Sequence, residues 1–269
     1  MPHVQLRDIV AYYEEAGSGS PPLLLIAGLG GHSGLWSLQL RSFSLSRRAI
    51  AFDNRGSGRS SAPDKPYSIA NMADDACQLL DMLDVERASV AGYGMGGSIA
   101  LELAAEHSDR VENLVLIGAT ARPSGRHRLV TEGWTAARRS SLSREQSFAL
   151  TAPWLYTSEL LADPSRRSQA IESGTKDPYP AQDHAYLRQG QAFLGYDATS
   201  KLSAIEQPSL VLVGEEDILV DAADAAGLAE ALPNGLLRQL PGAHAGLVEH
   251  PQAYSAAIGE FLNAPVPAS

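Results

Sequence analysis

Short apolar runs alternate with helix-period patterns along most of this chain, and this alternation most constrains its fold. The runs have the length of buried strands, and the segments between them carry apolar residues at i, i+3 and i+4 spacing. The clearest predicted helix begins after Ser68 as its N-cap. The order predicts an α/β fold on a largely parallel sheet, covered by helices on both faces. The predicted strands are residues 9–13, 23–27, 48–52, 88–93, 114–118, 209–214 and 236–240; further helices are predicted at 96–106, 222–231 and 252–262.

The alternation stops between about residues 121 and 202. This stretch has no strand pattern, contains five prolines and two of the tryptophans, and is too long for a plain loop. These features predict that residues 121–202 form a helical cap. The cap would be inserted into an α/β core made of residues 1–120 and 203–269. Its basic run is typical of a solvated face rather than a phosphate site; the run comprises Arg122, Arg126, His127 and Arg128.

The composition narrows the choice of partner and location. With 31 acidic and 21 basic residues the formal charge is -10, which disfavours nucleic acid or an anionic membrane as the main partner. The N-terminus lacks a secretory-signal pattern, and the longest apolar runs fall short of the ~18–20 residues of a membrane span. We therefore expect a cytoplasmic protein with a small-molecule substrate, no nucleic acid and no membrane partner. The oligomeric state stays open.

The cysteine count and the spacing of possible ligands bear on metal and redox chemistry. The single Cys77 excludes an intramolecular disulfide and a multi-cysteine metal site. It lies beside the apolar stripe of its helix among acidic neighbours, which predicts a small buried thiol rather than a reactive one. No His-Glu-x-x-His or other clustered ligand pattern occurs, so we expect no metal and no cofactor.

A glycine-rich turn follows the predicted strand 88–93. Gly92, Gly94 and Gly97 match the G-x-G-x-x-G pattern of dinucleotide-binding turns. That interpretation needs an acidic residue after the next strand, but residues 114–118 are followed by none, and Glu112 lies at the wrong end of that strand. The alternative is a nucleophile elbow, a sharp strand-to-helix turn that exposes a nucleophile and needs small flanking residues. Gly94 then occupies the nucleophile position.

Two further predicted strands are followed by groups that would complete such a site. Asp217 comes three residues after Gly214, and His244 lies on the loop after strand 236–240. A carboxylate can orient an imidazole, which then takes a proton from a nucleophile and returns it to the leaving group. We prefer Asp217 to Glu215 and Glu216 for its spacing. His244 is preferred to His250, which we interpret as structural at a helix start.

Backbone amides are the expected partners of an oxyanion in a site of this kind. The loop at residues 28–31 follows the strand 23–27 and is predicted to offer the amide of Leu29. The second amide is that of Met95, directly after the nucleophile position and at the positive end of a helix dipole. A plain tight loop at 28–31 is the alternative.

Another glycine-containing loop, residues 53–60, follows the strand 48–52. It lacks the Lys-Ser/Thr that follows the glycines of a phosphate-binding loop. We interpret it as structural, with Asp53 and Arg55 in local ion pairs.

Taken together, these motifs resemble the α/β-hydrolase superfamily, in particular the cap-bearing esterases and the 3-oxoadipate enol-lactonase-like group. The resemblance spans nearly the whole chain and implies an α/β-hydrolase fold and a nucleophile–His–Asp triad. It implies hydrolysis of a carboxylic ester or lactone, although this fold hosts other chemistries. The residues that carry it are Ala27-Gly-Leu-Gly-Gly, Phe52-Asp-Asn-Arg-Gly-Ser-Gly-Arg-Ser-Ser, Gly92–Gly97, Gly214-Glu-Glu-Asp217, Gly242-Ala-His244 and Glu249-His-Pro.

The chain departs from the resemblance at the nucleophile. Family members carry Ser where this chain has Gly94, and Ser98 is expected to serve packing instead. Three hypotheses follow: an ester or lactone hydrolase inactivated at Gly94; an enzyme with natural Gly94 that uses His244 and Asp217 for lyase, cyclase or water-mediated chemistry; and a non-catalytic binding protein. Retention of the acid, the histidine and the oxyanion loop favours the first two.

The predicted cap should cover the site and set substrate choice. Its aromatic side chains favour an apolar or aromatic substrate, although core packing is an alternative role for each. The candidate lining residues are Trp134, Trp154, Tyr156, Phe193 and Tyr196.

Overall fold

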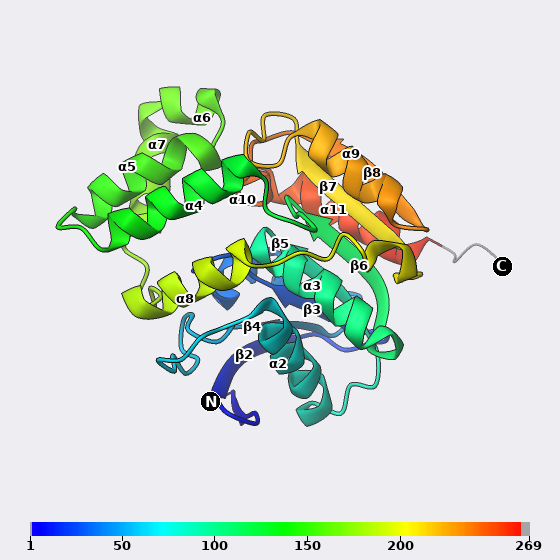
Figure 1. The fold of residues 1–269 in the computed structure, drawn as a ribbon. Helices are drawn as coiled ribbons and strands as arrows, with labels where there is room; N and C mark the ends of the chain where they lie inside the picture. The colour runs from blue at the N-terminus through cyan, green and yellow to red at the C-terminus, as the bar shows by residue number, and fades with distance from the viewer. Residues whose placement is uncertain (1, 265–269) are drawn as a thin grey trace.

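The structure is a computed structural model that describes residues 2–264. Its centre is an eight-stranded sheet in the order β1-β2-β4-β3-β5-β6-β7-β8. The pairs β1–β2 and β2–β4 are antiparallel, and the strands from β4 to β8 are parallel (Figure 1). The strands are β1 (His3–Gln5), β2 (Val10–Ala16), β3 (Leu23–Ile26), β4 (Ala49–Phe52), β5 (Ala88–Tyr93), β6 (Val111–Ile117), β7 (Ser209–Gly214) and β8 (Gly235–Leu240).

Helices cover both faces of this sheet, as expected for parallel strands that are apolar on both sides. Alternate residues of β3 separate two buried clusters: Leu24 and Ile26 contribute to one, Leu23 and Leu25 to the other. The first cluster lies under α2 (Ile69–Met82), α3 (Met95–Glu106) and α9 (Ala222–Ala231). The second lies under α1 (Ser37–Phe43), α10 (Gly246–Glu249) and α11 (Pro251–Asn263).

Five α-helices lie between β6 and β7, and we refer to them together as the cap. In Figure 1 helices α4 to α7 gather to one side of the sheet. Residues 118–208, all of which the structure describes, contain no strand, and these helices fall inside the predicted insertion 121–202. The cap helices are α4 (Gly125–Arg138), α5 (Arg144–Leu155), α6 (Ser158–Ala162), α7 (Pro164–Thr175) and α8 (Asp183–Leu194).

Local capping explains where several helices begin. The hydroxyl of Ser68 accepts from the amide of Asn71 at 3.0 Å, which confirms the predicted N-cap of α2. Ser124 and Ser143 start α4 and α5 with capping boxes, in which the third helical residue reaches back to the cap amide. These N-terminal hydrogen bonds define where α2, α4 and α5 begin.

The main differences from the predicted elements occur at the start of the sheet. Strand β1 was not expected, because it is three residues long and pairs only with β2 at the sheet edge. Strand β2 runs to Ala16, beyond the predicted residues 9–13. Within residues 2–264 no helix combines the length and apolar character needed to span a bilayer.

Candidate active site

Gly94 occupies the sharp turn between β5 and α3. Its φ of 55° and ψ of −120° belong to a region that residues with a side chain rarely adopt. Its amide donates to the carbonyl of Ile117 at 2.9 Å, and its carbonyl accepts from the amide of Gly97 at 2.9 Å. A Cβ on Gly96 would clash with the carbonyl oxygen of Ile26, so the helix can approach the sheet only with glycine there. This is the elbow geometry that the sequence predicts.

Asp217 and His244 form a hydrogen-bonded pair beside that turn. Asp217 Oδ2 lies 2.8 Å from His244 Nδ1. The other carboxylate oxygen accepts from the amides of Leu219 and Val220, at 2.8 and 3.0 Å. Because Nδ1 faces the carboxylate, Nε2 is left to face the elbow. A Cβ built on Gly94 would lie 3.6 Å from Nε2, and within residues 2–264 no other atom outside the adjoining residues lies within 4 Å of it.

The two predicted oxyanion amides flank the same space. Leu29 follows β3 in a tight turn closed by a 3.0 Å hydrogen bond from the amide of Gly31 to the carbonyl of Gly28. Met95 is the first residue of α3, where backbone amides have no partner inside the helix. Within the described residues, neither the Leu29 nor the Met95 amide donates a hydrogen bond to the protein. Both amides therefore lack a partner within the described part of the protein.

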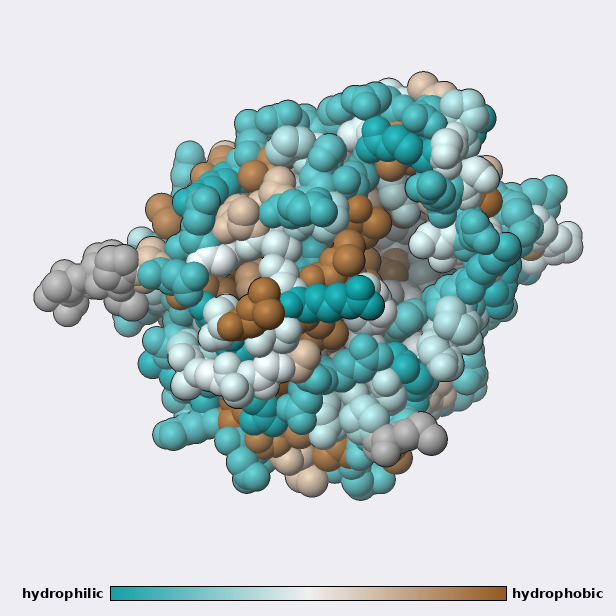
Figure 2. Space-filling view, turned by 180° about the vertical axis from the view of Figure 1, so that it is seen from behind, coloured by the Kyte–Doolittle hydropathy of each residue, from teal (hydrophilic) through white to brown (hydrophobic). Residues whose placement is uncertain are grey.

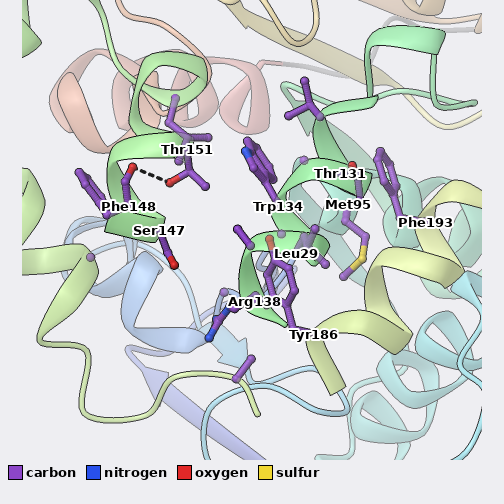
Figure 3. A pocket seen from close by; sticks show the side chains of 18 of the residues that line it. Leu29, Met95, Thr131, Trp134, Arg138, Ser147, Phe148, Thr151, Tyr186 and Phe193 are labelled. Carbon is purple, nitrogen blue, oxygen red and sulfur yellow. Dashed lines mark hydrogen bonds between the residues drawn. The ribbon is translucent and has the colours of Figure 1, made fainter. Parts of the chain in front are cut away.

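A pocket of about 840 Å³ lies between the cap and these residues. Gly94 and His244 lie in its wall. Figure 2 shows the molecular surface hollowed, with apolar side chains along one edge of the hollow. In Figure 3, Leu29 and Met95 of the core are grouped with side chains from α4, α5 and α8 around the pocket, which include Trp134, Phe148, Tyr186 and Phe193.

Comparison with known proteins identifies the family to which this fold belongs. The family model of the alpha/beta hydrolase fold matches residues 21–251. The chain belongs to the alpha/beta hydrolase family.

Individual relatives cover almost the full length of this hydrolase-family chain. A Caulobacter sp. (strain K31) protein, provisionally named carbamate hydrolase RutD, is 33% identical over 261 residues, covering 94% of this chain and 95% of the relative. The structure of the enol-lactonase from Burkholderia xenovorans LB400 has a TM-score of 0.90 at 24% identity, covering 98% of this chain and all of that one. A hydrolase from Pseudomonas aeruginosa PA01 has a TM-score of 0.86 at 27% identity, over 97% and 98% of the two chains.

Only two of the five aromatic residues predicted to line the pocket of this alpha/beta hydrolase do so. Trp134 and Phe193 lie in its wall. Trp154, Tyr156 and Tyr196 are not among its lining residues.

The three side chains that do not line the pocket have other surroundings. The α5 residues that line the pocket are Arg144, Ser147, Phe148, Thr151 and Leu155; Trp154, three positions after Thr151, is not among them. Tyr156 lies past the end of α5, where its ring lies 6.0 Å from that of Phe148. Tyr196 packs in the core cluster under α3 and borders a separate surface hollow beside α4.

His127 is a pocket residue that sequence reasoning missed. The arginines of its basic run are exposed as predicted, but His127 is 6% exposed and lines the pocket. Its Nδ1 lies 3.3 Å from the amide nitrogen and 2.9 Å from the hydroxyl of Ser124. Burial lowers its pKa to about 4, with the charge of His244 acting in the same direction. The sequence does contain a signal for this placement. His127, Val130, Thr131 and Trp134 have the i, i+3, i+4, i+7 spacing of residues that share one helix face.

Gln189 of α8 is a second missed residue, and it joins the cap to the oxyanion loop. Its side chain is fully buried. Oε1 accepts from the amide of Gly30 at 2.9 Å, while Nε2 donates to the carbonyl of Arg55 at 2.8 Å and the hydroxyl of Ser57 at 2.9 Å. The loop that carries Leu29 is therefore held in place by a cap helix.

The loop that carries His244 is joined to the cap as well. Glu249 accepts from the hydroxyl of Thr157 at 2.7 Å and from the amide of Ala243 at 3.2 Å. The amide of Ala245 donates to the carbonyl of Leu155 at 2.7 Å. His250 stands at the N-cap of α11, in keeping with its predicted structural role.

The loop at residues 53–60 makes the predicted ion pairs. Arg55 is paired to Asp75 through two hydrogen bonds of 2.7 Å and reaches Asp8 at 3.1 Å. Asp53 accepts from the amide of Ser33 at 2.7 Å, and its carboxylate lies 3.6 Å from Nε of Arg59. These contacts attach the loop to α2 and to the start of the chain.

Cys77 is buried as predicted, but a basic side chain does reach it. Arg110 Nη1 lies 3.2 Å from Sγ. Burial nevertheless raises the pKa of the Cys77 thiol and outweighs the attraction of Arg110 for the thiolate. Within residues 2–264, no group of three or more His, Cys, Asp or Glu side chains is placed to hold a metal ion.

Proposed function

We propose that this chain has the catalytic groups of a hydrolase that acts on the carbonyl of a small ester, lactone or carbamate, except for the covalent nucleophile. In this proposal Asp217 orients His244, and the amides of Leu29 and Met95 stabilise the oxyanion. The observation that carries it is the 3.6 Å distance from His244 Nε2 to the position of a Cβ on Gly94. A serine hydroxyl extending from that Cβ would come within hydrogen-bonding reach of Nε2.

Because Gly94 has no side chain, the native chain cannot form an acyl-enzyme at that position. We therefore propose that it is inactive or strongly impaired relative to a chain with serine at that position. Loss of a triad member elsewhere leaves ~10³–10⁴-fold catalysis over water, from the oxyanion hole and binding. The lining by Trp134, Phe193 and Phe148 supports an apolar or aromatic substrate. The proposed setting is the cytoplasm, with a small molecule as the partner.

A second candidate function is direct hydrolysis by water. The space beside Gly94 is open except for His244 Nε2, and a water molecule bound there could pass its proton to Nε2 as it attacks the carbonyl carbon. The proton then goes from His244 to the leaving alkoxide as the C–O bond breaks. The net reaction is ester plus water to acid plus alcohol, with no covalent intermediate.

One set of variants tests both candidates. The native chain, Gly94→Ser and Gly94→Ala are compared on a panel of p-nitrophenyl esters, aryl lactones and aryl carbamates, and with a fluorophosphonate probe. Gly94→Ala is the matched control because it adds a Cβ at the same φ and ψ without a hydroxyl. We expect only Gly94→Ser to be labelled and to hydrolyse the panel efficiently.

Each candidate function also has a result that would contradict it. A folded Gly94→Ser chain that is unlabelled and inactive on the whole panel contradicts the proposed function. For the water route, turnover by the native chain should fall when His244→Ala is added. Turnover that survives this change excludes His244 as the base.

A further inference from the structure

His127 is a buried titratable side chain for which the proposed chemistry has no use. It lies on the face of α4 that also carries Val130, Thr131 and Trp134, all of which line the pocket. Figure 3 shows Thr131 and Trp134 of this face at the pocket. His127 and His244 line the same cavity, one from the cap and one from the core. The imidazole also meets the ring of Phe193 edge-on at 5.8 Å.

The hydrogen bonds of His127 assign its tautomer. The amide of Ser124 can only donate, so its 3.3 Å contact assigns Nδ1 as an acceptor without a proton, and the Ser124 hydroxyl, 2.9 Å away, can donate to the same nitrogen. In the neutral ring the proton is therefore on Nε2, at the opposite edge of the imidazole. Within the described residues, Nε2 has no protein hydrogen-bond partner, and the pocket is the space that this edge can face.

Burial keeps this donor uncharged. The pKa of His127 is lowered to about 4, first by burial and then by the charge of His244, so the ring is neutral near neutral pH. A neutral N–H in an apolar wall is costly to leave unpaired when a ligand displaces water. A ligand that offers an acceptor oxygen at this position avoids that cost.

We propose that His127 is a substrate-recognition residue, whose Nε2–H selects ligands that carry an uncharged acceptor oxygen on the part that lies against α4. The proposal rests on the proposed function, since it assigns the substrate of that site an aromatic or apolar body with a carbonyl or ether oxygen. Helix capping alone does not call for an imidazole here. Gln or Glu fills the same place in a capping box and would leave no ring in the pocket.

Side-chain replacement separates recognition from capping. His127→Gln keeps the cap and retains an amide donor, whereas His127→Glu keeps the cap with an acceptor in place of the donor. His127→Met removes the donor without adding a charge. The thermal stabilities of the Gln and Glu variants show whether the helix start is preserved.

The test measures binding to the chain with Gly94, and each titration is checked for recovery of the intact probe so that hydrolysis does not enter the affinity. The probes are methyl phenylacetate, which carries acceptor oxygens, and propylbenzene, which carries none. We expect the native chain and His127→Gln to prefer the ester. His127→Glu and His127→Met should lose about tenfold in ester affinity, the size of one hydrogen bond, with hydrocarbon affinity unchanged.

Nuclear magnetic resonance of ¹⁵N-labelled native chain gives an independent readout. The Nε2 signal of His127, identified by its loss in His127→Gln, should be that of a protonated nitrogen and should shift with the ester but not with the hydrocarbon. The inference is overturned if Nε2 is unprotonated near neutral pH. It is also overturned if the native chain does not prefer the ester, or if the Glu and Met variants keep that preference. Failure of Gly94→Ser to hydrolyse esters would contradict the proposed function and leave these binding results unchanged.

Discussion

At residue 94 the backbone conformation and the chemistry make opposite demands. Glycine adopts a φ of 55° with a ψ of −120° at little cost, whereas a residue with a side chain is strained there by about 1–3 kcal/mol. The hydrolytic chemistry proposed for the site requires a hydroxyl at that position. Glycine at position 94 therefore avoids the strain energy of this turn but supplies no hydroxyl for nucleophilic attack.

We expect Gly94→Ser to lower the free energy of unfolding by about 1–3 kcal/mol while the fold is retained. A Cβ at residue 94 meets only His244 Nε2 at 3.6 Å, so strain rather than a clash sets the loss. Urea denaturation measures the change. Gly94→Ala should lose a similar amount, and a Gly94→Ser chain as stable as the native one would show that the turn is unstrained.

At the scale of elements, the site depends on contacts that the cap makes with two core loops. Helix α8 holds the loop of Leu29 through Gln189, and the end of α5 holds the loop of His244 through the backbone of Leu155. Glycine spacing and strand order indicated both core loops from sequence. The contacts that hold them were not predictable, because a buried glutamine in a helix does not reveal its partners.

Replacement of Gln189 by alanine tests this arrangement. It leaves the Gly30 amide, the Arg55 carbonyl and the Ser57 hydroxyl without this partner, and we expect a loss of about 3 kcal/mol in unfolding free energy. In a Gly94→Ser background the same change should lower kcat more than it raises KM, because Leu29 adjoins Gly30. Gln191→Ala, at an exposed position on the same helix, is the control. Equal kcat in the two variants would refute the link.

At the scale of the whole molecule, the cap closes over the carboxyl ends of the parallel strands and encloses titratable groups with the apolar lining. His127 faces the charges of His244 and Asp217 from across the pocket, and that of Arg126 from its own helix. Its pKa is about 4 in the folded chain, below the ordinary value of 6.5. The unfolded chain therefore binds a proton that the folded chain does not bind between these two values.

It follows that stability attributable to His127 is complete above about pH 6.5 and is lost as the pH falls toward about 4. The loss should approach about 3 kcal/mol of unfolding free energy. His127→Gln removes this contribution, so the stability difference between native and variant chains should change by that amount across the window. Urea denaturation at several pH values measures it, and a constant difference would show that His127 titrates normally.

The parallel sheet, the glycine-rich turn around Gly94, and the chain order in which Asp217 and His244 follow it could be predicted from the sequence. These features are local, because strand length, glycine spacing and the ends of apolar runs depend on the backbone and nearest neighbours. The cap side chains that line the pocket could not be predicted in this way: the folded chain places His127 among them and Trp154 outside them. The physical reason is that periodicity identifies the buried face of a helix, whereas the identity of what buries it comes from contacts between residues far apart in the chain.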